Sequence, residues 1–190
     1  MVPSRLVVNP IWLLPSIELV LLALLIAANP RRISRDHQVV RAGSLTLVAV
    51  ATFANVWTAV HLVDGLINGT EPEPAGQLLA YGAAIWATNV IVFALWYWEF
   101  DRGGPVARAK GTNPYPDFQF AQMQTPELAS NEWEPGFLDY LYLSFTNATA
   151  FSPTDTLPLS RWAKMAMLAQ SCVSLVTVAL VVARAVNILG

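Results

Sequence analysis

Residues 77–100 read QLLAYGAAIWATNVIVFALWYWEF, and this stretch decides the fold class. Its single charged residue is Glu99. About 20 consecutive apolar residues form a helix long enough to span the hydrocarbon core of a bilayer. The Trp96-Tyr97-Trp98 run near its end suits the headgroup boundary, where aromatic rings are enriched. The stretch therefore predicts a membrane-spanning helix.

Similar apolar runs occur at residues 11–29, 42–67 and 161–189. Composition agrees with them, because 55% of the 190 residues are hydrophobic and 13% are charged, whereas soluble domains average roughly 25% charged residues. The first run is too long for the apolar part of a signal peptide, and Asn29-Pro30-Arg31-Arg32 is a poor cleavage context. We therefore expect residues 11–29 to be a retained helix.

Two further segments precede the last run. Residues 101–136 are polar and rich in proline, but Phe118, Phe120 and Trp133 predict an ordered loop that lies against an apolar surface. Residues 137–151 are apolar but too short for a regular crossing. They predict either a re-entrant helix or a fifth crossing. The expected fold is a single all-α membrane domain over residues 1–190, with four spans and this short helix.

Basic residues indicate the orientation of the helices. They cluster at 31–41 and 102–110, whereas the 64–73 loop has none. The positive-inside rule places the basic loops in the cytoplasm, and the N-terminus and the Glu71/Glu73 loop outside. The chain would then enter residues 137–155 from the cytoplasmic side.

Residues 142–158 read YLSFTNATAFSPTDTLP, and they are followed by the long run from Arg161. A short aromatic and hydroxyl-rich helix, an aspartate, a spaced proline and a long helix resemble the pore helix and filter of two-helix potassium channels. The resemblance implies a pore-loop ion channel subunit that acts as a homo-oligomer, a tetramer by analogy, and conducts monovalent cations. Asp155 would attract the cations, and the path would be lined by Thr146, Asn147, Thr149, Ala150, Phe151, Ser152, Pro153, Thr154 and Asp155.

Potassium filters use a TVGYG run, whose carbonyl oxygens replace the hydration shell of the ion. Residues 150–154 read AFSPT and contain no glycine. Glycine permits the backbone conformations that aim successive carbonyls at an ion. The sequence therefore predicts a cation path that is not built as a potassium-selective filter.

A second resemblance covers Asp139–Phe145 (DYLYLSF), Arg184–Asn187 (RAVN) and Trp96–Pro105 (WYWEFDRGGP). These runs are similar to those of an uncharacterised family of bacterial integral membrane proteins. The family implies a multi-pass protein of the bacterial inner membrane. It implies no chemistry.

Polar residues within the apolar runs are further candidates, because ionisable groups at membrane depth are costly and usually paired or functional. They are Glu18, Asn55, His61 and Asn89. Glu18 is interpreted as a carboxylate that binds a cation or proton, as a structural partner of Asn55, His61, Asn89 or Trp86, or as a residue near the membrane interface. Gln170, Ser174 and Thr177 share one helical face. They would either line a wet inner-helix path or let helices pack closely.

Motifs of soluble enzymes are absent from the sequence. It contains no phosphate-binding loop, nucleophile elbow, dinucleotide fingerprint or metal-ligand cluster. No basic stripe predicts nucleic-acid binding, and Cys172 is the only cysteine. We expect a non-enzymatic protein without cofactor or metal whose partner is the lipid bilayer. Two alternatives to a channel are a non-conducting scaffold or accessory subunit that uses residues 101–136 for contacts, and a small transporter centred on Glu18.

Overall fold

The computed structural model describes residues 37–69, 75–130, 133–149 and 155–189. The expected helix at 11–29, with Glu18, and the candidate filter residues Ala150, Phe151, Ser152, Pro153 and Thr154 lie outside the described residues. Within the described part of the chain the structure is mostly helical, as predicted.

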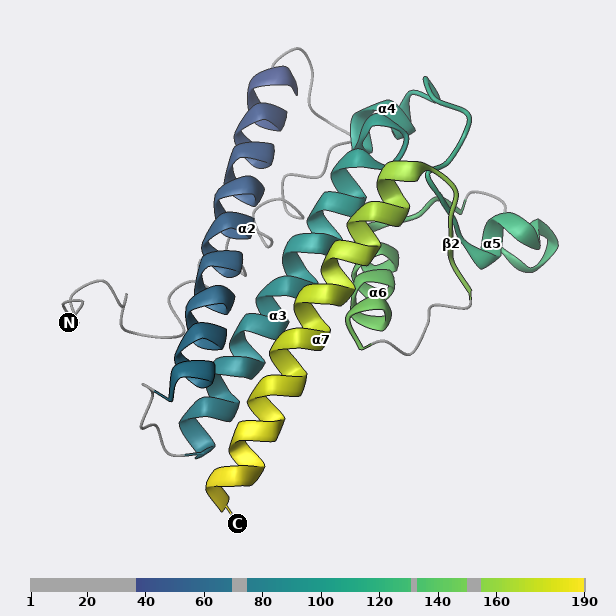
Figure 1. Cartoon of the computed structure of the whole chain (residues 1–190). Helices are drawn as coiled ribbons and strands as arrows, with labels where there is room; N and C mark the ends of the chain where they lie inside the picture. The colour runs from purple at the N-terminus through teal and green to yellow at the C-terminus, as the bar shows by residue number, and fades with distance from the viewer. Residues whose placement is uncertain (1–36, 70–74, 131–132, 150–154, 190) are drawn as a thin grey trace.

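Three long helices form the body of the protein: α2 (His37–Asn68), α3 (Ala75–Phe100) and α7 (Arg161–Leu189). Figure 1 shows α3 between α2 and α7, and it contacts both. All three helices are long and apolar enough to cross a membrane. Three of the four expected long apolar helices are therefore confirmed, while the fourth falls outside the described residues.

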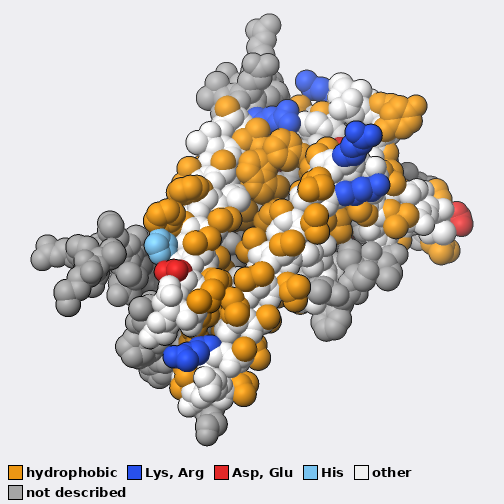
Figure 2. Space-filling view, in the orientation of Figure 1, with side chains coloured by type: hydrophobic (Ala, Val, Ile, Leu, Met, Phe, Trp, Pro, Cys, Tyr) orange, Lys and Arg blue, Asp and Glu red, His pale blue; other side chains and the backbone are white. Residues whose placement is uncertain are grey.

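Large apolar side chains point outward along these helices. Phe53 is 70% exposed, Leu175 is 63% exposed, and Figure 2 shows hydrophobic side chains over much of the visible face. Buried positions, in contrast, include polar residues such as Asn89 and Gln170. A soluble protein exposes large apolar patches mainly at binding surfaces. This distribution is compatible with helices surrounded by lipid.

Helices α3 and α7 approach each other closely at Gly82. A Cβ atom at this position would lie 2.7 Å from Val181 Cγ1. Small residues at helix contacts permit such an approach, which brings more atoms of the two helices into van der Waals contact. The glycine is therefore part of the α3–α7 interface.

We expect Gly82→Ala to lower stability by about 1–3 kcal/mol, because the added methyl group overpacks the interface. Thermal unfolding of the purified protein in detergent measures the loss. The double variant Gly82→Ala/Val181→Ala should recover much of it, since the clashing side chain is shortened. Gly76→Ala is the control, because nothing lies within 4 Å of a Cβ there. An equal loss in Gly76→Ala would contradict the assignment.

The short apolar segment forms α6 (Phe137–Ala148), a helix of 12 residues. The Asp139 carboxylate accepts a hydrogen bond from the Gly136 N–H at 2.7 Å at its start. Helix α6 then runs down α3: the Tyr140 hydroxyl meets Asp101 just beyond the end of α3, and Ala148 O lies 3.5 Å from Trp86 Nε1 near the middle of α3. Its last turn is thus level with the middle of the long helices.

The chain returns to the end from which α6 started. Strand β2 (Leu157–Pro158) pairs antiparallel with β1 (Phe118–Gln119), with Phe118 opposite Pro158, and α7 begins at Arg161. Figure 1 shows β2 running up to the end of the bundle where α3 finishes. We call residues 137–160 the α6 hairpin. The hairpin enters and leaves at one end of the α3–α7 pair.

The described part of the 101–136 loop is folded. It contains a 3-10 turn at Asp101–Gly103, α4 (Pro105–Ala109), β1, α5 (Ala121–Gln124) and a 3-10 turn at Pro126–Leu128. Gly104 has a φ of 98°, and a Cβ there would meet Glu99 O at 2.8 Å, so the turn after α3 requires glycine. Phe118 and Phe120 are buried in one apolar cluster with Tyr97, Tyr140 and Ala163. The apolar surface that the loop contacts belongs to the chain itself.

Candidate functional site

A group of buried amide and hydroxyl side chains joins α3, α6 and α7, and we call it the amide network. Every member is at most 7% exposed. The members are Asn89 and Tyr97 on α3, Ser144 and Asn147 on α6, and Gln170 and Ser174 on α7. The network therefore connects α6 to both α3 and α7.

Gln170 is the centre of the amide network and is fully buried. Its Oε1 accepts hydrogen bonds from the Tyr97 hydroxyl at 2.6 Å and from Asn147 Nδ2 at 2.8 Å. Its Nε2 donates to Ser144 O at 3.0 Å and to Ser144 Oγ at 2.7 Å. One side chain thus uses its full hydrogen-bonding capacity to connect α7 with both other helices.

The remaining members bind backbone carbonyls as well as each other. Asn89 Nδ2 donates to Ser174 Oγ at 2.8 Å and to Gln170 O at 3.2 Å. Asn147 Nδ2 also donates to Met167 O at 2.9 Å, and Ser144 Oγ donates to Val90 O at 2.6 Å. An unpaired buried polar group costs about 1–3 kcal/mol. These contacts therefore specify the depth and rotation of α6 against α3 and α7.

A second cluster lies where α3 ends and α7 begins, and we call it the aspartate cluster. Asp101 is fully buried, and its carboxylate accepts hydrogen bonds from the Tyr140 hydroxyl at 2.5 Å and the Asp117 N–H at 2.8 Å. The Asp117 carboxylate in turn accepts from Trp162 Nε1 at 2.7 Å. The cluster joins the loop to the starts of α6 and α7.

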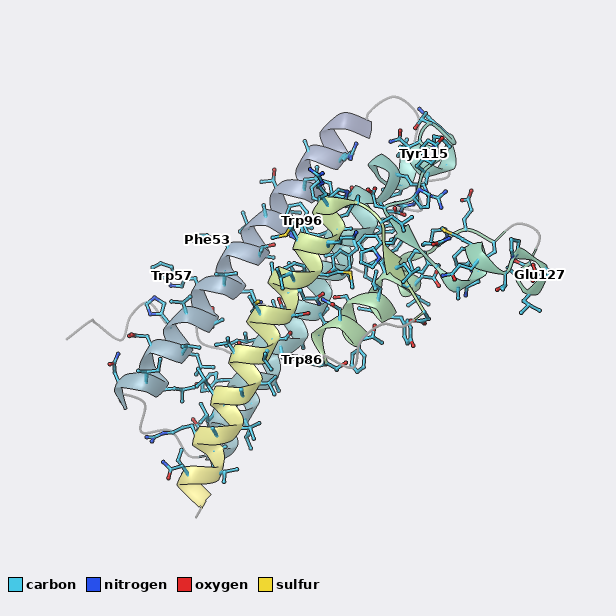
Figure 3. The ribbon with its side chains drawn as sticks, turned by 45° about the vertical axis from the view of Figure 1, so that its right-hand side comes forward. Phe53, Trp57, Trp86, Trp96, Tyr115 and Glu127 are labelled. Carbon is cyan, nitrogen blue, oxygen red and sulfur yellow. The ribbon has the colours of Figure 1, made fainter. Side chains whose placement is uncertain are left out.

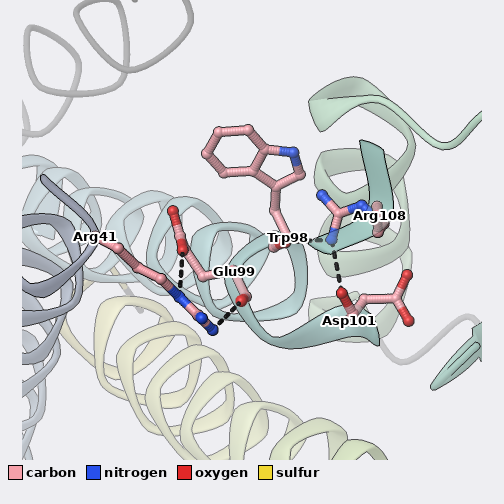
Figure 4. A network of polar contacts seen from close by, with 5 residues as sticks. All are labelled: Arg41, Trp98, Glu99, Asp101 and Arg108. Atoms are coloured by element: carbon pink, nitrogen blue, oxygen red, sulfur yellow. Dashed lines mark hydrogen bonds and ion pairs between the residues drawn. The ribbon is translucent and has the colours of Figure 1, made fainter. Parts of the chain in front are cut away.

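Arg108 completes the aspartate cluster. As Figure 4 shows, its guanidinium donates to Trp98 O at 2.7 Å and to Asp101 O at 2.8 Å. It also lies over the Tyr140 ring, 5.2 Å from the ring centroid. Burial lowers the pKa of the Arg108 guanidinium, whereas its charge interactions with Tyr140 and Asp101 act in the opposite direction. The cation binds the carbonyl groups at the end of α3, where a helix carries partial negative charge.

Arg41 and Glu99 connect α2 to the same end of α3. Arg41 Nε lies 3.9 Å from Glu99 Oε2, and a guanidinium nitrogen is 3.5 Å from Glu99 O. The Glu99 side chain is 6% exposed and that of Arg41 is 44% exposed. This is the one ion pair among the described residues, and its length and partial exposure make it a weak contact.

The candidate pore-lining residues of α6 differ in their surroundings. Asn147 belongs to the amide network, whereas the hydroxyls of Thr146 and Thr149 donate to carbonyls within α6 itself, Tyr142 O at 2.9 Å and Phe145 O at 3.1 Å. Asp155 is exposed and lies shortly before β2. Thr146, Thr149 and Asp155 are thus the candidates whose side chains are directed away from the buried network.

The inner-helix candidates Gln170, Ser174 and Thr177 are all buried, at 0–2% exposed. They face the chain's own core, so their position favours close helix packing over a wet path. Of the intramembrane candidates, Asn89 is part of the amide network and Asn55 is buried on α2. His61 is exposed and packs edge-on against the Trp57 ring at 4.6 Å. The structure does not bring His61 together with Asn89.

Sequence reasoning missed Tyr97, Ser144, Asp101 and Arg108. Tyr97 was attributed to an interfacial aromatic run, yet it is fully buried. A signal existed for Asp101, because a carboxylate directly after an apolar run, followed within ten residues by an arginine, offers a buried charge and a partner. Nothing local marks Ser144, whose hydrogen-bond partner Val90 O is 54 positions away.

The arrangement is suited to holding α6 in place against α3 and α7. Among the described residues, no three His, Cys, Asp or Glu side chains are grouped to hold a metal ion. The amide nitrogens of Asn89, Asn147 and Gln170 donate to side-chain or backbone oxygens of neighbouring helices. Comparison of the chain with protein-family models, curated proteins and solved structures finds no match in any of the three.

Proposed function

We propose that the chain is a multi-pass membrane protein and a subunit of an oligomeric, cation-conducting assembly in which the α6 hairpin is a pore loop. One observation carries the proposal. The hairpin enters and leaves at one end of the α3–α7 pair, and its helix ends level with the middle of α3. Non-helical backbone at membrane depth is tolerated where it lines water or is shielded by protein. The end of α6 at this depth fits a lining role.

The chemistry at the end of α6 supports a cation as the conducted species. A helix C-terminus carries partial negative charge, which favours cations. Thr146 and Thr149 add hydroxyl oxygens at this end, and Asp155 adds an exposed carboxylate after it. One hairpin cannot surround an ion, so the proposal requires several copies around an axis, four by analogy with potassium channels. A bacterial inner membrane follows from the family resemblance.

Charge indicates how the proposed subunit would be oriented. Six described basic residues lie at the end where the hairpin enters: Arg41, Arg102, Arg108, Lys110, Arg161 and Lys164. Arg184 lies near the opposite end, and Figure 2 shows this asymmetry. Under the positive-inside rule the hairpin is entered from the cytoplasm. Its orientation is then inverted relative to potassium channels.

Asp155→Asn tests the channel. We expect the substitution to reduce cation flux into liposomes several-fold, because a carboxylate at a pore mouth raises the local cation concentration. Asp64→Asn, an exposed change on α2, is the control and should leave flux unchanged. Reconstituted wild-type protein that conducts no monovalent cation, or purified particles without a central axis, would contradict the proposal.

The second candidate function is a non-conducting scaffold or accessory subunit. It is favoured by the burial of Asn147, Gln170 and Ser174, whose polar groups find partners inside one chain rather than along an open path. A scaffold predicts no flux in the wild type or in Asp155→Asn. A transporter centred on Glu18 instead predicts that Glu18→Gln abolishes flux while Asp155→Asn has little effect.

A further inference from the structure

An open apolar groove lies between α2 and α3, near the end where α2 begins. It has a volume of about 570 Å³ and is lined by Leu45, Ala49, Val50 and Phe53 from α2 and by Trp96 and Phe100 from α3. The Trp96 and Phe100 rings stack with centroids 4.9 Å apart and form one wall. Figure 3 shows Phe53 and Trp96 on the two helices that border the groove.

The groove is the exposed part of a packed interface. Below it, Val48 of α2 is buried with Val92 and Leu95 of α3. Above them, Val50 is 61% exposed and Phe53 is 70% exposed. The groove thus continues the α2–α3 contact outward, on a surface made almost entirely of hydrocarbon and aromatic groups.

We propose that residues 11–29 of the same chain form a helix that occupies this groove. The run is apolar and long enough for a membrane helix. Residues 30–36 are the only link between it and α2. A link of this length reaches at most about 25 Å when fully extended. The end of the run must therefore lie near the start of α2, beside the mouth of the groove.

Helix geometry defines the register of the two helices. Consecutive helices joined by a short link are usually antiparallel neighbours, and both rise about 1.5 Å per residue. Counting outward from a turn centred on residue 33, the middle of the link, places Leu21 level with Leu45, Ile17 with Ala49, and Leu13 with Phe53. Residues spaced by four share one helical face. An apolar stripe at 13, 17 and 21 would therefore face the groove, with Ile17 against the smallest lining residue.

The same register gives Glu18 a position. It becomes level with Val48, which is buried against Val92 and Leu95 of α3. The Glu18 carboxylate would then lie beside the α2–α3 contact rather than beside the α6 hairpin. Docking of residues 11–29 is independent of ion conduction, and it holds for a channel or a scaffold alike.

Disulfide formation in intact membranes tests the proposal. Cys172→Ser removes the only native cysteine. In this background, Ala49→Cys is combined with a cysteine at each position from 13 to 23, and oxidation is followed by mass spectrometry of proteolytic fragments. Ile17→Cys should give the highest intramolecular yield, because disulfides need Cβ atoms about 3.5–4.5 Å apart. Leu19→Cys, on the opposite face of the helix, is the matched control.

Three results would overturn the proposal. A uniform disulfide yield over all positions means that no single face of the segment packs against the groove. Disulfide-linked dimers mean that a second copy of the chain occupies the groove. The absence of any disulfide means that lipid, and not residues 11–29, covers the groove. The pair Leu21→Cys/Leu45→Cys gives a second measurement if Ala49→Cys disturbs folding, and it should also form an intramolecular disulfide.

Discussion

Gln170→Leu is expected to destabilise the protein by about 2–4 kcal/mol, because several buried groups lose their partner at once. Leucine has a similar volume but cannot accept from the Tyr97 hydroxyl or the Asn147 amide, nor donate to Ser144. Asn147 and Ser144 retain one carbonyl partner each, at Met167 and Val90. Tyr97 retains none in the amide network, so its hydroxyl accounts for most of the loss. Thermal unfolding in detergent measures the change.

Two variants make this expectation specific. Gln77→Leu is the matched control, because Gln77 is exposed at the start of α3 and should change stability by less than about 0.5 kcal/mol. Adding Tyr97→Phe to Gln170→Leu should recover part of the loss, since the unpaired hydroxyl is removed. If the double variant shows the simple sum of two losses, the two side chains are not coupled and the amide network is not cooperative.

Asp101→Ala should produce a loss of similar size, about 2–4 kcal/mol, localised where α3 ends and α7 begins. The substitution leaves the Tyr140 hydroxyl and the Asp117 N–H without their acceptor. It also removes a negative charge near the buried Arg108 guanidinium. We expect the 101–136 loop to detach from the starts of α6 and α7, and limited proteolysis of that loop to accelerate.

Glu127→Ala is the control for Asp101→Ala, because Glu127 is an exposed acid in the same loop. Proteolysis at wild-type rates in Asp101→Ala would show that the loop does not depend on the aspartate cluster. Tyr140→Phe removes one of the two contacts and should have a smaller effect. Asp101→Asn keeps an acceptor oxygen, so it should fall between the alanine variant and the wild type.

The hydropathy of the sequence was enough to locate the three long helices that the structure describes. The run expected at 161–189 coincides with α7, whereas α2 and α3 begin at 37 and 75 instead of 42 and 77. Helical hydrogen bonds continue past the last apolar side chain, so polar end residues can extend a helix. The 137–151 run predicted a short helix, re-entrant or a fifth crossing, and the structure has a helix of 12 residues there.

The hydrogen bonds between residues far apart in the chain could not be predicted from the sequence. Asn89 and Ser174 are 85 positions apart, and neither side chain carries a local sign of its partner. The polar face of α7 was recognised, but a helical face alone does not say whether it meets water or another helix. The aromatic residues of the loop indicated an apolar neighbour, yet the choice between membrane, partner and the chain's own core required the packing around Phe118.

The position of Gln170 has a consequence for biosynthesis. A ribosome synthesises α6 before α7. The Asn147 side chain of α6 therefore leaves the ribosomal tunnel before Gln170, its partner on α7. Asn147 would be unpaired if α6 entered lipid alone, at a cost of several kcal/mol. In a membrane, the segment would therefore wait at the surface until α7 has inserted, and then descend between two crossings already in place.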